Sequence, residues 1–299
     1  MAGSEASVAL IGYGEVGTIF GRALAAGGAR VTAYDILVRD PVRAEALAQR
    51  AQADGIRLAS SAADAVAGAE LAIVAVTASA TRAATESIVG ALARGALCLD
   101  VNSASPATKI ACGERIDAAG GRYVEAAVMT SVPPYGLAVP MLLGGRHASD
   151  ALPRLRALGF EATVASTTLG VASATKMCRS IVIKGMESQF VESLLCARRH
   201  GVEDEVIASL AETFPGIDWE RQATYFWSRV VQHGKRRAEE MREAAAMVRE
   251  DGFEPLMAGA TAERQAFVAA LAARGTFRDA EPADGWRPLA DRAIGAQRE

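Results

Sequence analysis

Three glycines near the start of the chain have the spacing of a turn that binds phosphate groups. The segment Gly12-Tyr13-Gly14-Glu15-Val16-Gly17 follows a short apolar run and precedes a helical pattern. In a G-x-G-x-x-G segment of this kind, the first glycine permits a tight turn, the second lets the backbone approach a pyrophosphate, and the third lets the helix pack closely on a sheet. The amino end of the helix offers unpaired N–H groups and a partial positive charge to the phosphates. We predict that residues 12–17 bind a dinucleotide, the alternative being a glycine-rich turn without a ligand.

An acidic residue stands where the next strand after this turn is expected to end. Asp35 follows the run at residues 30–34 and comes 18 positions after Gly17. A carboxylate at this place binds the hydroxyl groups of the adenosine ribose and repels a 2′-phosphate. The pattern therefore favours NAD as the cofactor, with NADP as the alternative because Arg39 lies only four residues further on. Asp35 could instead simply begin a turn.

The elements that must position these residues alternate between strand and helix. Strands are predicted at residues 8–11, 30–34, 71–76, 96–101, 123–129, 140–144 and 161–165, and helices at 16–26, 41–53, 62–66, 80–93 and 106–119. Uninterrupted apolar strands are typical of a parallel sheet buried on both faces. The alternation predicts an α/β fold with a doubly wound, Rossmann-type sheet over residues 1–166. Val76 and Thr77, at the end of one expected strand, are further candidates for cofactor binding.

The second part of the chain has a different pattern. From about Thr167 the β-branched runs give way to helical periodicity, and helices are predicted at residues 172–199, 203–214, 219–249 and 256–273. Residues 167–299 are therefore expected to form an all-α domain. The tail from Thr276 has few large apolar residues, so part of it is expected to be disordered.

Two more segments, together with the glycine turn, resemble the β-hydroxyacid dehydrogenase family, which includes 3-hydroxyisobutyrate dehydrogenase and 6-phosphogluconate dehydrogenase. Asp100-Val101-Asn102-Ser103-Ala104-Ser105-Pro106 is similar to the family's substrate-loop pattern D-x-S-T-x-x-P. Gly170-Val171-Ala172-Ser173-Ala174-Thr175-Lys176 is similar to its G-x-G-x-x-x-K motif. The resemblance implies a Rossmann domain followed by an all-α domain.

The same resemblance implies that Lys176 is catalytic. It would exchange a proton with the substrate hydroxyl while a hydride passes between the substrate carbon and the nicotinamide. A lysine in the first turn of a helix is repelled by the helix dipole, which favours a functional role over a surface position. Asn102 and Ser103 follow a strand end, where open α/β sheets bind their ligands. We assign Asn102 to the cofactor and Ser103 to the substrate, although an Asn/Ser helix cap before Pro106 is an alternative.

Several positions depart from the family's pattern. The family's asparagine four residues after the lysine is Ser180 here, and its S-G-G loop corresponds to Met129-Thr130-Ser131, so both glycines are replaced. The decarboxylating branch has a histidine three residues after the lysine, where this chain has Arg179. An arginine there could clamp a carboxylate, a phosphate or a sulfonate, or it could be an exposed charge. The candidate substrate-binding residues are Ser103, Thr130, Ser131, Arg179 and Ser180.

Composition limits the remaining classes of function. The chain has 299 residues and a formal net charge of −3, without the basic excess of a nucleic-acid-binding protein. Its four cysteines and three histidines show no zinc-binding spacing, so no metal site is expected. No apolar run approaches the ~20 residues that span a bilayer, and no secretory signal is recognisable, so the expected location is the cytoplasm.

These observations predict an NAD(P)-dependent dehydrogenase that acts on the CH–OH group of a small, polar, β-hydroxyacid-like alcohol. One alternative is a reductase of a bulkier ketone or imine in which Lys176 only orients the substrate; imine reductases share the architecture but lack the lysine. A second alternative is a non-catalytic dinucleotide-binding sensor. A homodimer or larger homo-oligomer is expected, because Trp219, Tyr225, Phe226 and Trp227 form an aromatic cluster typical of interfaces, unless that cluster is an internal core.

Overall fold

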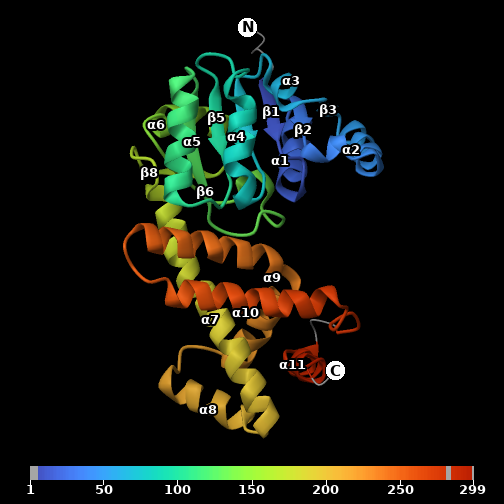
Figure 1. The fold of residues 1–299 in the computed structure, drawn as a ribbon, viewed down its shortest axis with the longest axis vertical. Coiled ribbons are helices and arrows are strands. Elements are labelled where there is room, and N and C mark those ends of the chain that lie inside the picture. Colours follow the sequence, from blue (N-terminus) through green and yellow to red (C-terminus); the bar gives the residue numbers. More distant parts are fainter. Residues whose placement is uncertain (1–5, 281–283, 298–299) are drawn as a thin grey trace. The chain divides into compact units, whose positions relative to one another are not determined.

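The computed structural model describes residues 6–280 and 284–297. The chain divides into two compact units, Met1–Lys176 and Met177–Glu299, which are described separately (Figure 1). The sequence places the domain boundary at residue 167, after the last expected strand. The units instead divide within a long helix, between Lys176 and Met177.

The N-terminal unit is built on a sheet of eight strands in the order β3-β2-β1-β4-β5-β6-β7-β8. The strands are β1 Ser7–Ile11, β2 Arg30–Tyr34, β3 Arg57–Leu58, β4 Leu71–Val74, β5 Leu97–Asp100, β6 Arg122–Val128, β7 Met141–Gly144 and β8 Ala162–Ser166. Neighbouring strands are parallel except for β6 and β7, which are antiparallel. The strand order reverses between β1 and β4, and ligands of doubly wound sheets bind at such a switch point.

Helices cover both faces of this sheet (Figure 1). They are α1 Glu15–Ala26, α2 Pro41–Ala53, α3 Ala62–Val66, α4 Thr81–Val89, α5 Pro106–Ala118 and α6 Ala148–Ala157, with short 3-10 turns η1 Ile36–Arg39, η2 Ala78–Ala80 and η3 Gly136–Ala138. Alternate residues of β1 enter two separate cores. Val8 and Leu10 pack with side chains of α1, α2 and α6, and Ala9 and Ile11 pack with those of α3, α4 and α5. The predicted fold class, a doubly wound sheet buried on both faces, is confirmed.

The second unit is helical, as predicted. Helix α7 Val171–His200 runs into it from the first unit and is followed by α8 Glu203–Thr213, α9 Trp219–Glu250, α10 Leu256–Ala273 and α11 Arg287–Gly295. Trp219, Phe226 and Trp227 are buried within this unit, and only Tyr225 is half exposed. The ring of Phe190 on α7 stacks on that of Trp219 with 5.0 Å between their centroids. The aromatic cluster is therefore mainly an internal core.

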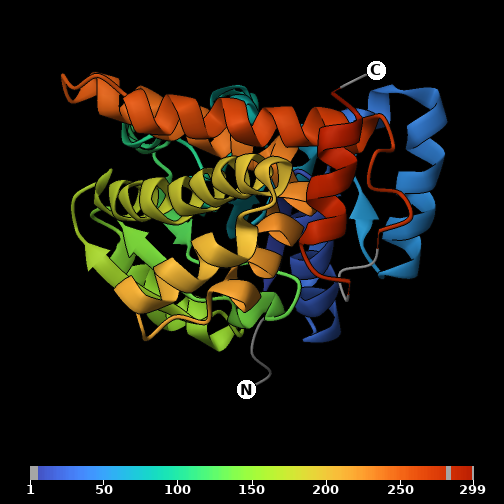
Figure 2. The same cartoon turned by 90° about the horizontal axis from the view of Figure 1, so that it is seen from below.

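The described part of the tail contains a helix. The sequence predicts disorder for part of the tail after Thr276, and the residues described there include helix α11, which is red in Figure 2. Trp286 is fully buried, and its indole Nε1 donates to Glu220 Oε1 of α9 at 3.0 Å. A single large aromatic side chain thus anchors a segment whose average composition is polar. Residues 281–283 and 298–299 of the tail lie outside the described residues.

Candidate active site at the carboxyl ends of the strands

The glycine turn has the geometry that its sequence predicts. Gly12 has a φ of +99°, and a Cβ placed on it would lie 2.2 Å from the carbonyl oxygen of Ala75. A Cβ on Gly17 would lie 2.1 Å from the carbonyl oxygen of Gly12. Both positions are too close-packed for any side chain, because real Cβ atoms do not approach within 3.0 Å of other atoms. These two glycines bring the first turn of α1 directly onto the end of β1.

Gly14 differs, because a Cβ on it would meet no atom within 4 Å. It is the N-cap of α1 and has no side chain that could accept a hydrogen bond from the first turn. Gly14 and Glu15 are exposed, and Val16 is half-buried. The open space therefore faces the amino end of a helix, which suits the pyrophosphate of a dinucleotide. The residues present fit such a cofactor.

Tyr13, which the sequence assigns to the cofactor, has a side chain that packs inside the protein. Its ring is fully buried, and its hydroxyl donates to Asp54 Oδ2 at 2.7 Å. Burial raises the pKa of the Tyr13 phenol well above its ordinary value, so the hydroxyl remains a donor. Its main-chain N–H donates to Asp35 Oδ2 at 2.8 Å, and its carbonyl accepts from Thr18 Oγ1. The side chain and main chain of Tyr13 therefore hold the turn in place.

Asp35 lies at the end of β2 and is half-buried. Besides accepting from Tyr13, it accepts from the N–H of Leu37 at 3.0 Å through Oδ1 and thereby caps η1. Each carboxylate oxygen has a second lone pair, so capping the turn leaves room for ribose hydroxyls. Arg39, the residue on which the alternative of NADP rests, is exposed at the end of η1.

Asn102 joins the ends of two neighbouring strands. Its side-chain Oδ1 accepts from the main-chain N–H of Val76, after β4, at 2.7 Å. Its own N–H donates to Asp100 Oδ1 at 2.9 Å, at the end of β5. Its Nδ2 is buried and has no hydrogen-bond partner among the described residues. This buried donor at the sheet edge fits a polar group of a ligand, whereas the helix cap is made by Ser105, whose Oγ accepts from Thr108 N.

A buried ion pair holds this strand end. Asp100 is fully buried, and Lys109 of α5 reaches its Oδ1 at 2.7 Å and its carbonyl oxygen at 2.9 Å. Tyr123 of β6 donates its hydroxyl to Asp100 Oδ2 at 2.7 Å. Burial raises the pKa of Tyr123, so the phenol stays neutral and serves as a donor. Sequence reasoning missed Lys109 and Tyr123, because only the fold shows that a lysine of α5 points back at the strand.

The substrate loop and the lysine motif come together, although 73 residues separate them. Lys176 Nζ donates to Ser103 Oγ at 2.5 Å, and both side chains are half-buried. Lys176 is the sixth residue of α7, counted from Val171, so it lies in the second turn and not in the first as predicted. The repulsion by the helix dipole is weaker there. The pair places an amine and a hydroxyl side by side near the carboxyl end of β5.

The other substrate candidates lie elsewhere. Thr130 is exposed and Ser131 half-buried on the loop after β6, and Thr77, a candidate for the cofactor, is exposed after β4. Arg179 and Ser180 lie one turn beyond Lys176 on α7 and belong to the second unit. Arg179 is exposed, and Ser180 Oγ accepts from Lys184 Nζ at 3.0 Å. The structure therefore brings Ser103 and Lys176 into contact, and it puts Arg179 and Ser180 in a separate unit.

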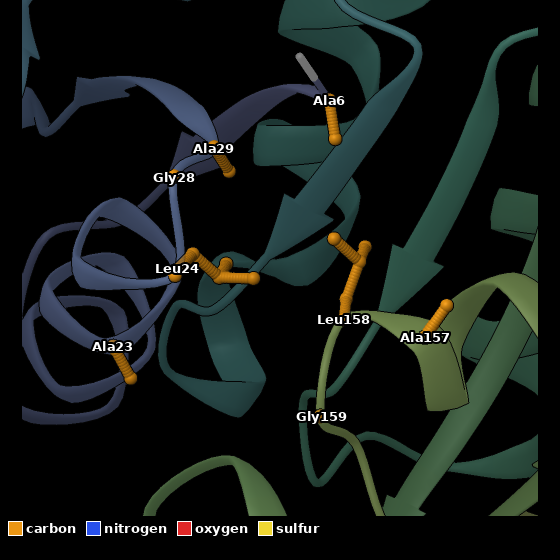
Figure 3. A pocket seen from close by; sticks show the side chains of 9 residues that line it. Ala6, Ala23, Leu24, Gly28, Ala29, Ala157, Leu158 and Gly159 are labelled. Carbon is orange, nitrogen blue, oxygen red and sulfur yellow. The ribbon is translucent and has the colours of Figure 1, made fainter. Parts of the chain in front are cut away.

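A surface hollow of the N-terminal unit lies apart from Ser103 and Lys176, neither of which lines it. Figure 3 shows it at the carboxyl ends of α1 and α6, beside Ala6 and Ala29, which precede β1 and β2. Its volume is about 410 Å³. Only alanine, glycine and leucine line it, so it offers no side-chain chemistry.

Among the described residues, no group of three or more His, Cys, Asp or Glu could hold a metal ion, and no helix is long and apolar enough to cross a membrane.

Comparison with known proteins places these features in a family. Residues 7–151 match the NAD binding domain of 6-phosphogluconate dehydrogenase, and residues 197–268 match a domain of unknown function, DUF1932. A conserved hypothetical protein from Sinorhizobium meliloti 1021 is 36% identical over 97% of this chain and 96% of its own, with a TM-score of 0.78. An uncharacterised protein of Methanothermus fervidus is 28% identical over 162 residues, so the match spans only 61% of that curated relative.

Two more distant structures share the fold. The 3-hydroxyisobutyrate dehydrogenase of Mycobacterium tuberculosis is 18% identical over 99% of this chain and 100% of its own, with a TM-score of 0.72. An imine reductase from Myxococcus stipitatus, solved with NADP⁺, is 19% identical over 90% and 95%, with a TM-score of 0.58. The chain belongs to the β-hydroxyacid dehydrogenase family as a divergent member. Its N-terminal unit is an NAD(P)-binding domain of a type that occurs in oxidoreductases.

The glycine turn supports a matched pair of substitutions. Gly14→Ala should leave stability unchanged, because its Cβ meets open space, but should weaken NADH binding by obstructing the approach of the pyrophosphate. Gly17→Ala should lower the free energy of unfolding by about 1–3 kcal/mol through overpacking against Gly12. Urea unfolding and fluorescence titration with NADH measure the two effects. Equal stability losses in the two variants would contradict the assignment.

Proposed function

We propose that this protein is an NAD(P)-dependent dehydrogenase that acts on the CH–OH group of a small, polar, β-hydroxyacid-like substrate. The contact between Lys176 Nζ and Ser103 Oγ is the observation that carries the proposal. It supplies a titratable amine and a hydrogen-bonding hydroxyl near the strand end occupied by Asn102. The glycine turn of the same unit supplies the place for a dinucleotide.

In this proposal the residues divide the work by their chemistry. The bound nicotinamide supplies hydride transfer to and from the substrate carbon. Ser103 Oγ orients the substrate oxygen, and Lys176 Nζ takes the hydroxyl proton during oxidation and returns it during reduction. A lysine with an ordinary pKa of ~10.4 is a poor base at neutral pH, so the reaction requires that its pKa be lowered in the complex, as exclusion of water would do. Asn102 Nδ2 donates to the cofactor, and Asp35 binds the adenosine ribose.

A reductase of a bulkier ketone or imine is the second candidate. It is favoured by the imine reductase that shares this fold and by Thr130 and Ser131, which stand where the dehydrogenase pattern has two glycines. Lys176 then orients the substrate without exchanging a proton. A dinucleotide-binding sensor without turnover is the third candidate. A substrate screen that follows NADH and NADPH absorbance separates all three.

Lys176 gives the decisive variant for proton transfer. A positioned acid–base group contributes ~10²–10⁴-fold to the rate, so Lys176→Ala should lower kcat by about that factor while the affinity for NADH changes little. Lys176→Arg should fail as well, since a guanidinium stays protonated. Steady-state kinetics and cofactor titration give the two quantities. Full turnover by Lys176→Ala would make the lysine structural and move the reductase of a bulkier ketone or imine ahead.

Asp35 tests the choice of cofactor. We expect the unmodified protein to bind NADH more tightly than NADPH, because the carboxylate repels a 2′-phosphate. Asp35→Asn should narrow that gap, since it removes the charge but keeps an oxygen that can accept from Tyr13 N or Leu37 N. Fluorescence titration with both cofactors measures the difference. A clear preference for NADPH in the unmodified protein would refute the assignment.

We also propose that the chain assembles as a homodimer or larger homo-oligomer through its helical unit. Although its aromatic cluster is internal, the unit exposes large apolar side chains: Val182 is 62% exposed, Phe253 72% and Leu256 71%. Exposed apolar side chains of this size are typical of interaction surfaces. Light scattering should give at least twice the monomer mass at micromolar concentration, and a monomer throughout that range would contradict the proposal.

A further inference from the structure

Glu125 of β6 is a buried acid that the proposed chemistry does not use. It lies directly opposite Asp100 in the pairing of β5 with β6, and both side chains are fully buried. A buried carboxylate requires partners, because desolvation of its charge is costly. Asp100 has Lys109 and Tyr123 as partners. Glu125 instead accepts through Oε1 from the main-chain N–H of Gly170 at 2.7 Å and of Ala172 at 3.3 Å.

These donors belong to the beginning of α7, the helix that carries Lys176. Val171 is its first residue, so Glu125 satisfies N–H groups at the amino end of the helix, where a negative charge is also favoured by the helix dipole. Ser173 Oγ donates to the carbonyl of Gly170 at 3.0 Å and completes this first turn. A side chain from the sheet thus takes the place of a local capping residue.

The sheet makes room for this carboxylate. Gly144 of β7 pairs with Glu125, and a Cβ placed on Gly144 would lie 2.3 Å from Glu125 Oε1. Gly170 has a φ of +92°, which turns the chain into α7. Any larger residue at position 144 would displace the acid, so the glycine and the acid together form a fixed seat for the helix.

The two neighbouring carboxylates therefore hold the two halves of the Lys176–Ser103 pair. Asp100 fixes the loop that carries Ser103, through Asn102 N and Lys109. Glu125 fixes the turn before Lys176, which follows Ala172 by four residues, or about one helical turn. We propose that Glu125 is a positioning residue that sets Lys176 Nζ against Ser103 by holding the amino end of α7. The role in turnover rests on the proposed function, whereas the structural role can be measured without it.

Hydrogen exchange in the 299-residue chain tests the structural role. Glu125→Met fills the same space but cannot accept the two N–H bonds, whereas Glu125→Gln retains an amide oxygen that can. We expect the amides of Gly170 and Ala172 to exchange about tenfold faster or more in Glu125→Met, and at nearly the original rate in Glu125→Gln. Gly144→Ala, which displaces the carboxylate without removing it, should reproduce the faster exchange and serves if Glu125→Met does not fold.

A control on the same strand shows whether the effect is local. Tyr123→Phe removes a buried hydrogen bond to Asp100 and should leave exchange at Gly170 and Ala172 unchanged. Unchanged exchange at these two amides in both Glu125→Met and Gly144→Ala would overturn the proposal. So would faster exchange there in Tyr123→Phe to the same extent, since this would show a general loosening of the sheet.

Turnover then separates positioning from the proposed chemistry. A small displacement of a reacting group costs up to about 100-fold in rate, so Glu125→Met should lower kcat by as much as that and Glu125→Gln far less. In a Lys176→Ala background, Glu125→Met should cause no further loss, because it acts through the lysine. An equal loss in that background would overturn the positioning role. Full activity of Lys176→Ala itself would refute the proposed function and leave the exchange result standing.

Discussion

The buried charge of Asp100 is the constraint on which the rest of the site depends. Its carboxylate accepts hydrogen bonds from three donors: Lys109 Nζ of α5, Tyr123 Oη of β6 and Asn102 N of the loop between β5 and α5. Removing one partner of a buried ion pair leaves an uncompensated charge and costs about 3–5 kcal/mol. Water cannot take the place of these three donors at the buried carboxylate. The loop that carries Asn102 and Ser103 therefore has one favourable conformation.

At the carboxyl ends of the strands, that conformation links the residue proposed for the cofactor, Asn102, with the residue that contacts Lys176, Ser103. Asn102 accepts a hydrogen bond from Val76 N, which follows β4 at the switch point. The next residue, Ser103, contacts Lys176. Hydride transfer requires that the cofactor and the proton-transfer group be aligned on one substrate. In the proposed enzyme the glycine turn and Lys176 both belong to the N-terminal unit, Met1–Lys176, so their alignment follows from the packing of that one unit.

Much of this arrangement follows from the sequence, because the relevant signals are local. The apolar runs identify the strands, and the spacing of Gly12 and Gly17 predicts their roles. A Cβ on either glycine would lie too close to a neighbouring carbonyl oxygen. The direction of the Tyr13 side chain does not follow from the motif. A motif specifies backbone geometry, whereas the direction of a side chain depends on a partner such as Asp54 that is distant in sequence. The roles of Lys109 and Glu125 do not follow from the sequence for the same reason. Helix α6 was missed because Pro153 interrupts its pattern, and α11 because one buried tryptophan anchors it.

The substrate is harder to predict from the sequence than the type of reaction, and the reason is physical. The proposed chemical step depends on groups that are fixed by buried charges and close-packed glycines, which tolerate few alternatives. The candidates for substrate recognition are side chains that the core does not constrain: Thr130 and Arg179 are exposed, and Arg179 and Ser180 belong to the second unit. Replacing two glycines of the family's loop by Thr130 and Ser131 changes the shape offered to a substrate without touching Asp100, Glu125 or the glycine turn. In the proposed enzyme, therefore, a change of substrate does not require a change in the groups that move the hydride and the proton.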